Sequence, residues 1–121
     1  MPIISAKIRQ GTTPALDIIV NQEALQDCTV YITIDQGSRQ LIKTNYNKDP
    51  SVIIVPVYDE EGTQIASNIT VMLSQSETMR LRPGHGKIQV RWIDEAGIAD
   101  SSEIARIEIP KSLQKGVIVY G

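Results

Sequence analysis

The stretch KIQVRWIDEAG, residues Lys87–Gly97, decides the fold class of this chain. Polar and apolar residues alternate in its first half, which places Ile88, Val90 and Trp92 on one face and the polar residues between them on the other, toward solvent or a partner. This period of two is typical of a β-strand with one buried face. The turn DEAG follows at once, and Asp and Gly are residues that hairpin turns favour. We therefore expect a strand, a tight turn and a returning strand.

The same arrangement occurs earlier in the chain, where VPVYDEEG spans Val55–Gly62. If the chain returns antiparallel after each turn, both acidic turns lie at one end of the fold. Their carboxylates are of the type that binds Ca²⁺. Turn preferences already account for these residues, so we expect solvated turns and no metal site.

The turn signals divide the chain into about eight short strands. We expect them at 3–9, 15–20, 29–35, 39–43, 52–58, 63–73, 86–93 and 103–109. Ser74 and Glu77 form a capping-box pattern, which predicts one short helical turn near 75–81, ending before Pro83. The sequence thus predicts an all-β fold, an antiparallel immunoglobulin-like sandwich of 7–8 strands in a single domain over 1–121, with an open barrel as the alternative.

Two apolar segments are candidates for contact with other proteins. Pro56 interrupts the run that begins at Val52, and a proline cannot donate to a β-ladder, so an edge strand is favoured over a bulged one. The tail 116–121 is apolar on both faces and either pairs as a last strand or docks elsewhere. The candidate interaction residues are Ile53, Val55, Val57, Val117, Ile118, Val119 and Tyr120. Separately, Ile104 breaks the alternation of its strand, which predicts a bulge near 102–104.

Length and composition exclude several classes of protein. The 121 residues fit one domain, and the net charge of −2, with scattered Lys and Arg, argues against nucleic acid as a partner. A single cysteine, Cys28, forms no internal disulfide and is expected to be a small buried hydrophobe. The first residues lack a signal-peptide pattern, and no apolar run approaches the ~20 residues of a membrane span. We expect a protein made in the cytoplasm that leaves it only within an assembly such as a virion.

Catalytic chemistry has no visible basis in this sequence. The one histidine, His85, lies between two glycines and is read as an exposed turn residue. No phosphate loop, dinucleotide fingerprint or metal-ligand spacing is present. The chain is therefore expected to be no enzyme and to use no cofactor. A glycan-binding module would need aromatic platforms, but the chain has one Trp, four Tyr and no Phe, and Trp92 falls on the inward face of its strand.

Several short motifs recur together in one order. They are RQGTTP (9–14), VYIT (30–33) with Gln36, LSQSET (73–78), QVR (89–91) and LQKGVI (113–118). In this order the chain resembles a family of small proteins encoded in phages and prophages of Firmicutes, which are regarded as structural. Members read LTQEET where this chain has LSQSET, a change that keeps the capping pattern. The resemblance implies a β-sandwich of the virion or prophage that works by association, in the tail or baseplate region.

The leading hypothesis is thus a structural or adaptor protein that forms a homo-oligomer or binds a virion partner. The alternative is a stand-alone ligand-binding module, for example for a glycan. An assembly component should present an apolar edge or tail, whereas a ligand module needs a concave aromatic or acidic site.

Overall fold

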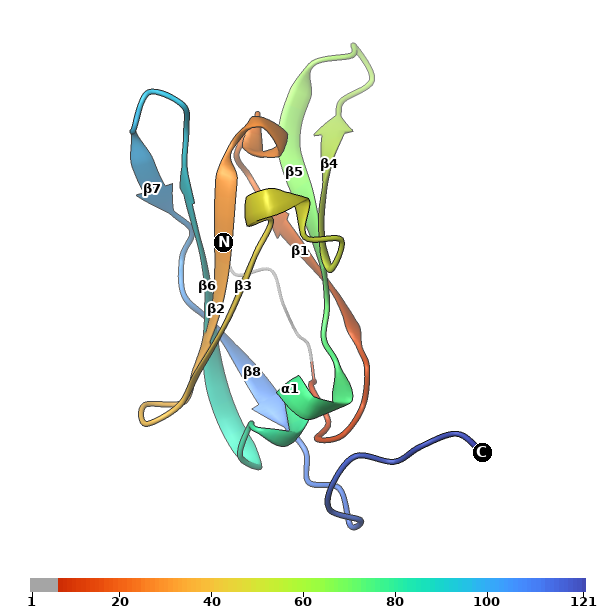
Figure 1. Cartoon of the computed structure of the whole chain (residues 1–121). Coiled ribbons are helices and arrows are strands. Elements are labelled where there is room, and N and C mark those ends of the chain that lie inside the picture. Colours follow the sequence, from red (N-terminus) through yellow and green to blue (C-terminus); the bar gives the residue numbers. More distant parts are fainter. Residues whose placement is uncertain (1–6) are drawn as a thin grey trace.

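Two antiparallel β-sheets pack face to face in the computed structural model of the chain, which describes residues 7–121 (Figure 1). The strands are β1 Ala15–Val20, β2 Thr29–Asp35, β3 Gln40–Thr44, β4 Val52–Tyr58, β5 Gln64–Met72, β6 Gly84–Ile93, β7 Ala99–Ser101 and β8 Ala105–Ile109. Three short helical segments connect them: η1 Leu25–Asp27, η2 Tyr46–Lys48 and α1 Gln75–Met79.

The order of the strands is that of an immunoglobulin-like sandwich. One sheet has the order β1-β5-β4, and the other has the order β3-β2-β6, with β7 and β8 both paired to β6. These correspond to the B-E-D and C′-C-F-G sheets of that fold. The predicted all-β antiparallel sandwich is therefore confirmed, and the open barrel is wrong because the described strands form two separate sheets.

The core lies between the sheets and is built from alternate residues of each strand. In the larger sheet the antiparallel register places Val30 opposite Trp92 and Ile32 opposite Val90, all of them buried. The facing sheet contributes Ile18, Ile69 and Val71 among others. A slip of one residue in β6 would turn its whole buried face outward, so this packing fixes the register. The predicted inward face of β6 is confirmed.

The predicted strand 103–109 corresponds to β8, which begins at Ala105, and a short strand that the expected bounds left out, β7, precedes it. Ser102 separates them. Its N–H donates to the Val90 carbonyl at 2.8 Å, and its hydroxyl accepts from the Val90 N–H at 3.0 Å. A side-chain oxygen thus replaces a backbone carbonyl in the ladder, which confirms the predicted irregularity near 102–104.

The predicted strand 3–9 lies largely outside the described residues. Within them, Lys7 makes a single parallel bridge to Glu108 of β8, and the Ile8 N–H donates to the Glu108 carbonyl at 2.9 Å. The Ile8 side chain is fully buried. The start of the described chain therefore covers the outer side of β8.

The predicted capping box is present in α1. The Glu77 N–H donates to the Ser74 hydroxyl at 3.1 Å, and the Ser74 N–H donates to the Glu77 carboxylate at 2.8 Å. The helix ends at Met79, before Pro83 as expected. Thr78 is fully buried, and its hydroxyl donates to the Thr12 carbonyl at 2.8 Å. These contacts fix α1 at the end of the sandwich opposite to the tips of the β4–β5 and β6–β7 hairpins (Figure 1).

Candidate functional site

The first half of the candidate site is the outer edge of β4, which within residues 7–121 pairs with β5 alone. The prediction of an edge strand is confirmed. No residue of Val52–Tyr58 carries a charge. Ile53 and Val55 point to the outer face and are 45% and 49% exposed, while Val57 is half-buried. Edge strands of monomeric proteins are usually protected by charged side chains, and this strand has none.

The backbone of β4 explains why a proline is tolerated in it. The Met72 N–H donates to the Ser51 carbonyl at 2.8 Å. Hydrogen-bonded residues alternate along an antiparallel pair. The backbone groups that point toward β5 are therefore those of every second residue after Ser51, namely Ile53, Val55 and Val57. Val52, Ile54 and Pro56 direct theirs outward, where Pro56 needs no N–H.

Only part of this outward-facing backbone is available to a partner. The Val52 N–H already donates to the Asp49 carbonyl at 3.3 Å, and Pro56 has no N–H. At the middle of the edge, Ile54 therefore offers both an N–H and a carbonyl, while Val52 and Pro56 each offer a carbonyl. The edge therefore has enough hydrogen-bonding groups to pair with a short strand but too few to pair with a long one.

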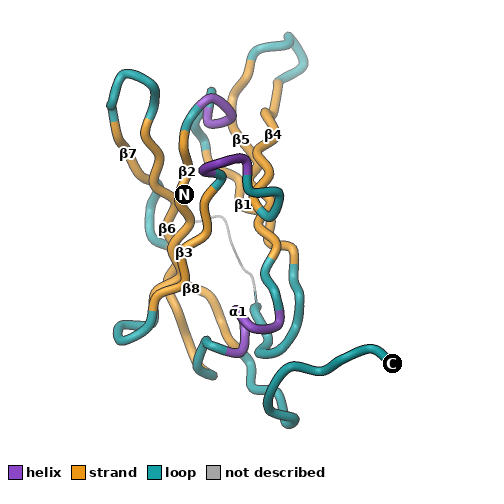
Figure 2. The backbone as a smooth tube through the Cα atoms, in the orientation of Figure 1, coloured by secondary structure: helices purple, strands orange, loops and turns teal. Residues whose placement is uncertain are grey.

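The second half of the candidate site is the C-terminal arm, residues 116–121. The hypothesis that the arm pairs as a last strand is wrong, because the arm belongs to no sheet and leaves the end of the sandwich as loop (Figure 2). The reason lies at β8. Its outer side is bonded by Ile8 at Glu108, and Pro110 ends the strand, so no free edge remains beside it.

The arm exposes more than half of each of its apolar side chains. Val117 and Ile118 are 52% and 56% exposed, Val119 is 89% exposed, and Tyr120 is fully exposed. Burial of such side chains would remove a large apolar area from water, and their own domain does not provide it. The structure thus places all seven predicted interaction residues at the surface, although Val57 is partly covered.

A glutamine of α1 holds the arm. The Gln75 amide donates to the Ile118 carbonyl at 3.0 Å, and the Ile118 N–H donates to the Gln75 amide oxygen at 2.9 Å. The amide thus bonds one residue as a neighbouring strand would, with both backbone groups of Ile118 facing α1. In an extended arm, the backbone groups of Val117 and Val119 then face away from α1. Sequence reasoning missed Gln75, whose position in a capping pattern gives no sign of this role.

The edge and the arm do not meet within one chain, because the arm leaves the sandwich at the α1 end, whereas β4 runs toward the other end (Figure 1). The helix that holds the arm follows directly after β5, which is the neighbour of β4 (Figure 1). Among residues 7–121, no hydrogen bond joins the arm to β4, and its bonds are those to Gln75. Each chain therefore carries an open edge and an unpaired strand-like segment.

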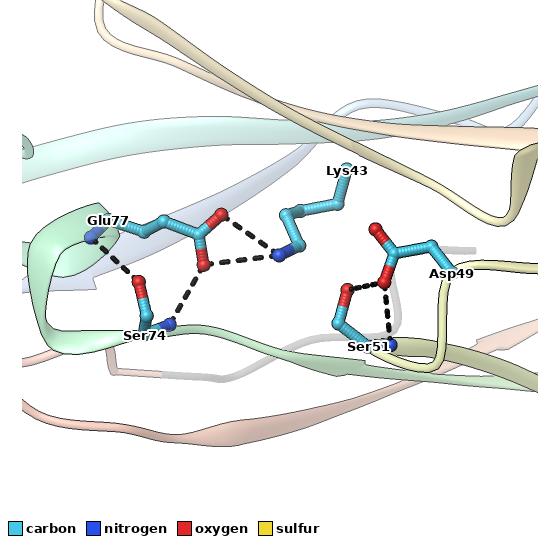
Figure 3. Close-up of polar contacts among 5 residues, drawn as sticks. All are labelled: Lys43, Asp49, Ser51, Ser74 and Glu77. Atoms are coloured by element: carbon cyan, nitrogen blue, oxygen red, sulfur yellow. Dashed lines mark hydrogen bonds and ion pairs between the residues drawn. The ribbon is translucent and has the colours of Figure 1, made fainter.

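An ion pair joins α1, the helix that holds the arm, to β3 of the larger sheet (Figure 3). Lys43 of β3 donates to both carboxylate oxygens of Glu77, at 2.9 and 3.1 Å. Partial burial raises the pKa of Glu77, but the hydrogen bonds and charge of Lys43 and the hydrogen bonds of Ser74 outweigh it, so the pKa is lowered overall. Nearby, hydrogen bonds from the N–H and hydroxyl of Ser51 lower the pKa of Asp49.

This shifted carboxyl predicts a pH dependence of stability. Because the pKa of Glu77 is lower in the folded chain, its contribution is complete above the ordinary value of 4.5 and is lost as the pH falls through the folded value. Glu77→Gln keeps an acceptor for Ser74 but does not titrate. Urea unfolding should therefore show a stability difference between wild type and Glu77→Gln that shrinks from pH 7 to acid. A difference that stays constant would contradict the ion pair.

The two acidic turns have the same hydrogen bonds. One carboxylate oxygen of Asp59 accepts from the N–H groups of Glu61 and Thr63, all at 2.9 Å. Asp94 does the same for Ala96 and Ile98. The glycine that closes each turn has a φ of +84°, as expected for a three-residue hairpin loop in which a left-handed residue follows a type I turn. The predicted hairpins are confirmed, and each aspartate is used by its own turn.

Both turns lie at the same end of the sandwich, as expected, but on different sheets (Figure 1). Among the described residues, no group of three carboxylate, imidazole or thiol side chains is placed to hold a metal ion. We expect millimolar Ca²⁺ or EDTA to leave the melting temperature unchanged, whereas a site filled at a hundred times its dissociation constant would add about 2.7 kcal/mol. A thermal-unfolding scan that rises with Ca²⁺ would overturn the solvated-turn interpretation.

The surroundings of His85, Cys28 and Trp92 give none of them a role in a site. His85 is exposed but lies in β6, paired with Glu108, and not in a turn as expected. Cys28 is half-buried against the core, which corrects the expectation of full burial. Burial, with the charges of Asp94 and Asp27, raises the pKa of its thiol. Trp92 is 8% exposed, so it offers no platform for a sugar.

The ends of η1 and the β6–β7 hairpin enclose an acidic hollow of about 440 Å³. The edge of Trp92 borders it, with Glu23, Asp27, Asp94 and Asp100 among the lining residues. Of four hollows in the described part of the chain, it has the most carboxylates in its lining.

Comparison with known proteins adds no family to this description. Neither a scan of protein-family models nor a search of curated proteins finds a match to the chain. Of the helices in the described part of the chain, none has the length and apolar character needed to cross a membrane.

Proposed function

We propose that this chain is a non-enzymatic structural or adaptor protein that acts by associating with other protein subunits. The observation that supports this most strongly is the pair of uncharged apolar surfaces, the β4 edge and the C-terminal arm. An isolated domain gains nothing by exposing both, and an open edge invites pairing with another chain. A partner that covers them gives each a role.

The proposed setting is a phage particle, in the tail or baseplate region. This part of the proposal rests on the ordered motifs of the sequence, from RQGTTP at 9–14 to LQKGVI at 113–118. Particles of this kind repeat one subunit around a symmetry axis, and such repetition suits a chain that can give and receive a contact. The protein would then be made in the cytoplasm and carried within the virion.

A ligand-binding module is the second candidate, and the acidic hollow beside Trp92 favours it. Such a site would attract a cationic or hydroxyl-rich ligand. The exposed tyrosines do not line this hollow, so it lacks the stacking surfaces that sugars use. A ligand module of this kind would remain a monomer, which distinguishes the two candidates.

Light scattering over a range of concentrations tests the proposal. We expect the full-length chain to show a mass above the 13.4 kDa of one copy, rising with concentration. A mass that stays at one copy up to high concentration would contradict self-association. The remaining form of the proposal, assembly on a different subunit, would then be tested with the products of neighbouring genes.

A further inference from the structure

We infer that the C-terminal arm of one copy adds as an antiparallel strand to the β4 edge of a second copy. The inference rests on the proposed function, and it specifies the contact and its register. It starts from the finding that a single chain carries both halves of a β-pairing and leaves both open.

The backbone groups of the two segments match in number and direction. With Val119 opposite Ile54, these two residues exchange both of their hydrogen bonds. The N–H of Gly121 then meets the Val52 carbonyl, and the N–H of Val117 meets the Pro56 carbonyl. The edge lacks donors at Val52 and Pro56, and in this register each of those positions is needed only as an acceptor.

The Gln75 contact is compatible with this pairing and prepares for it. Gln75 bonds Ile118 on one side of the arm, while the second copy bonds Val117 and Val119 on the other side. The clamp therefore stays in place when the partner arrives. It also holds the arm extended beforehand, which reduces the conformational entropy lost on binding.

The side chains match in the same register. Tyr120 lies opposite Ile53 and Ile118 opposite Val55, and all four are exposed in the single chain. These cross-strand pairs would cover each other on the outer face. Val119 falls beside Ile54, which is packed against the core. Neither segment has a charged side chain to desolvate.

The contact joins two different surfaces, because each copy gives an arm and receives one. Such a head-to-tail contact forms a ring where the rotation between copies closes and a chain where it does not. The repeated geometry is what a ring-shaped particle component requires.

Cross-linking between two single-cysteine variants tests the register. In a Cys28→Ser background, a chain with Ile53→Cys is mixed with a chain with Tyr120→Cys, and the mixture is oxidised. In the proposed register this is a non-hydrogen-bonded pair, whose Cα atoms lie about 4.5 Å apart, within reach of a disulfide. Val55→Cys with Ile118→Cys is a second, independent pair. In the matched control, Ile42→Cys, which is exposed on the other sheet, takes the place of Ile53→Cys in the mixture.

We expect disulfide-linked dimers from both pairs and not from the Ile42→Cys control. Association without these cross-links would overturn the inference and leave the proposed function standing. A monomeric mass at every concentration would overturn the inference and the self-association form of the proposed function, and would leave only assembly on a different subunit. A chain with Ile53→Cys and Tyr120→Cys together that closes an internal disulfide as a monomer would also overturn the inference, because the arm would then pair with its own edge.

A second test addresses the backbone. Ile54→Pro removes the outward N–H and leaves the bonds of β4 to β5 in place, whereas Ile54→Ala removes side-chain packing and keeps the N–H. Loss of a hydrogen bond should weaken the association constant by about tenfold for the proline variant, relative to the alanine variant. Circular dichroism shows whether each variant is folded. Folded variants that associate equally would contradict strand addition.

Discussion

Replacing Trp92 with alanine should lower the free energy of unfolding by about 3–5 kcal/mol. The Trp92 ring is buried between the sheets, opposite Val30 in the ladder. Its removal leaves a cavity that the neighbouring strands cannot close without disturbing the register. Urea unfolding followed by circular dichroism measures the change.

The control for this prediction is the preceding residue of the same strand. Arg91 is exposed on the outer face, so Arg91→Ala should change the free energy of unfolding by less than about 0.5 kcal/mol. A near-zero change for Trp92→Ala would place the indole outside the core. The glycan-binding alternative would then regain its aromatic platform.

Ending the chain at Lys115 should abolish self-association and leave the fold intact. The arm contributes only exposed side chains and its two bonds to Gln75 among the described contacts. Solvent-exposed hydrogen bonds of this kind add little to stability. Light scattering should therefore give the mass of one copy, with a melting temperature close to that of the full-length chain.

A matched variant separates the arm from its clamp. Gln75→Ala keeps every arm residue but removes both bonds to Ile118, so it should weaken association without abolishing it. A shortened chain that loses several kcal/mol of stability would show instead that the arm is part of the fold. A shortened chain that associates as before would show that the contact lies elsewhere.

The fold class could be predicted from the sequence because its determinants are local. Alternation in β6 and the Asp-Gly turns each act over a few residues, and the capping box of Ser74 and Glu77 acts over four. The edge position of β4 could also be predicted, because Pro56 disfavours a central strand. Each of these features is fixed by chemistry that adjacent residues supply.

The arm could not be predicted because its placement depends on distant contacts. An apolar run of four residues, Val117 to Tyr120, is typical of a strand, but pairing requires a free edge nearby. Ile8 occupies the edge of β8, a contact across a hundred residues of chain. The Gln75 clamp spans 43 residues, and the β7 strand forms around Ser102 through its bonds to Val90. No local pattern encodes such pairings.

Hydrogen exchange of the 121-residue chain at low and high concentration shows directly whether the arm adds to the β4 edge. We expect the amides of Ile54, Val117 and Val119 to exchange freely in the single copy and to become protected as the protein associates. The amides of β2, bonded on both sides in the larger sheet, should be protected at both concentrations. Association that leaves Ile54 and Val119 unprotected, or that protects a different surface, would contradict addition of the arm to β4.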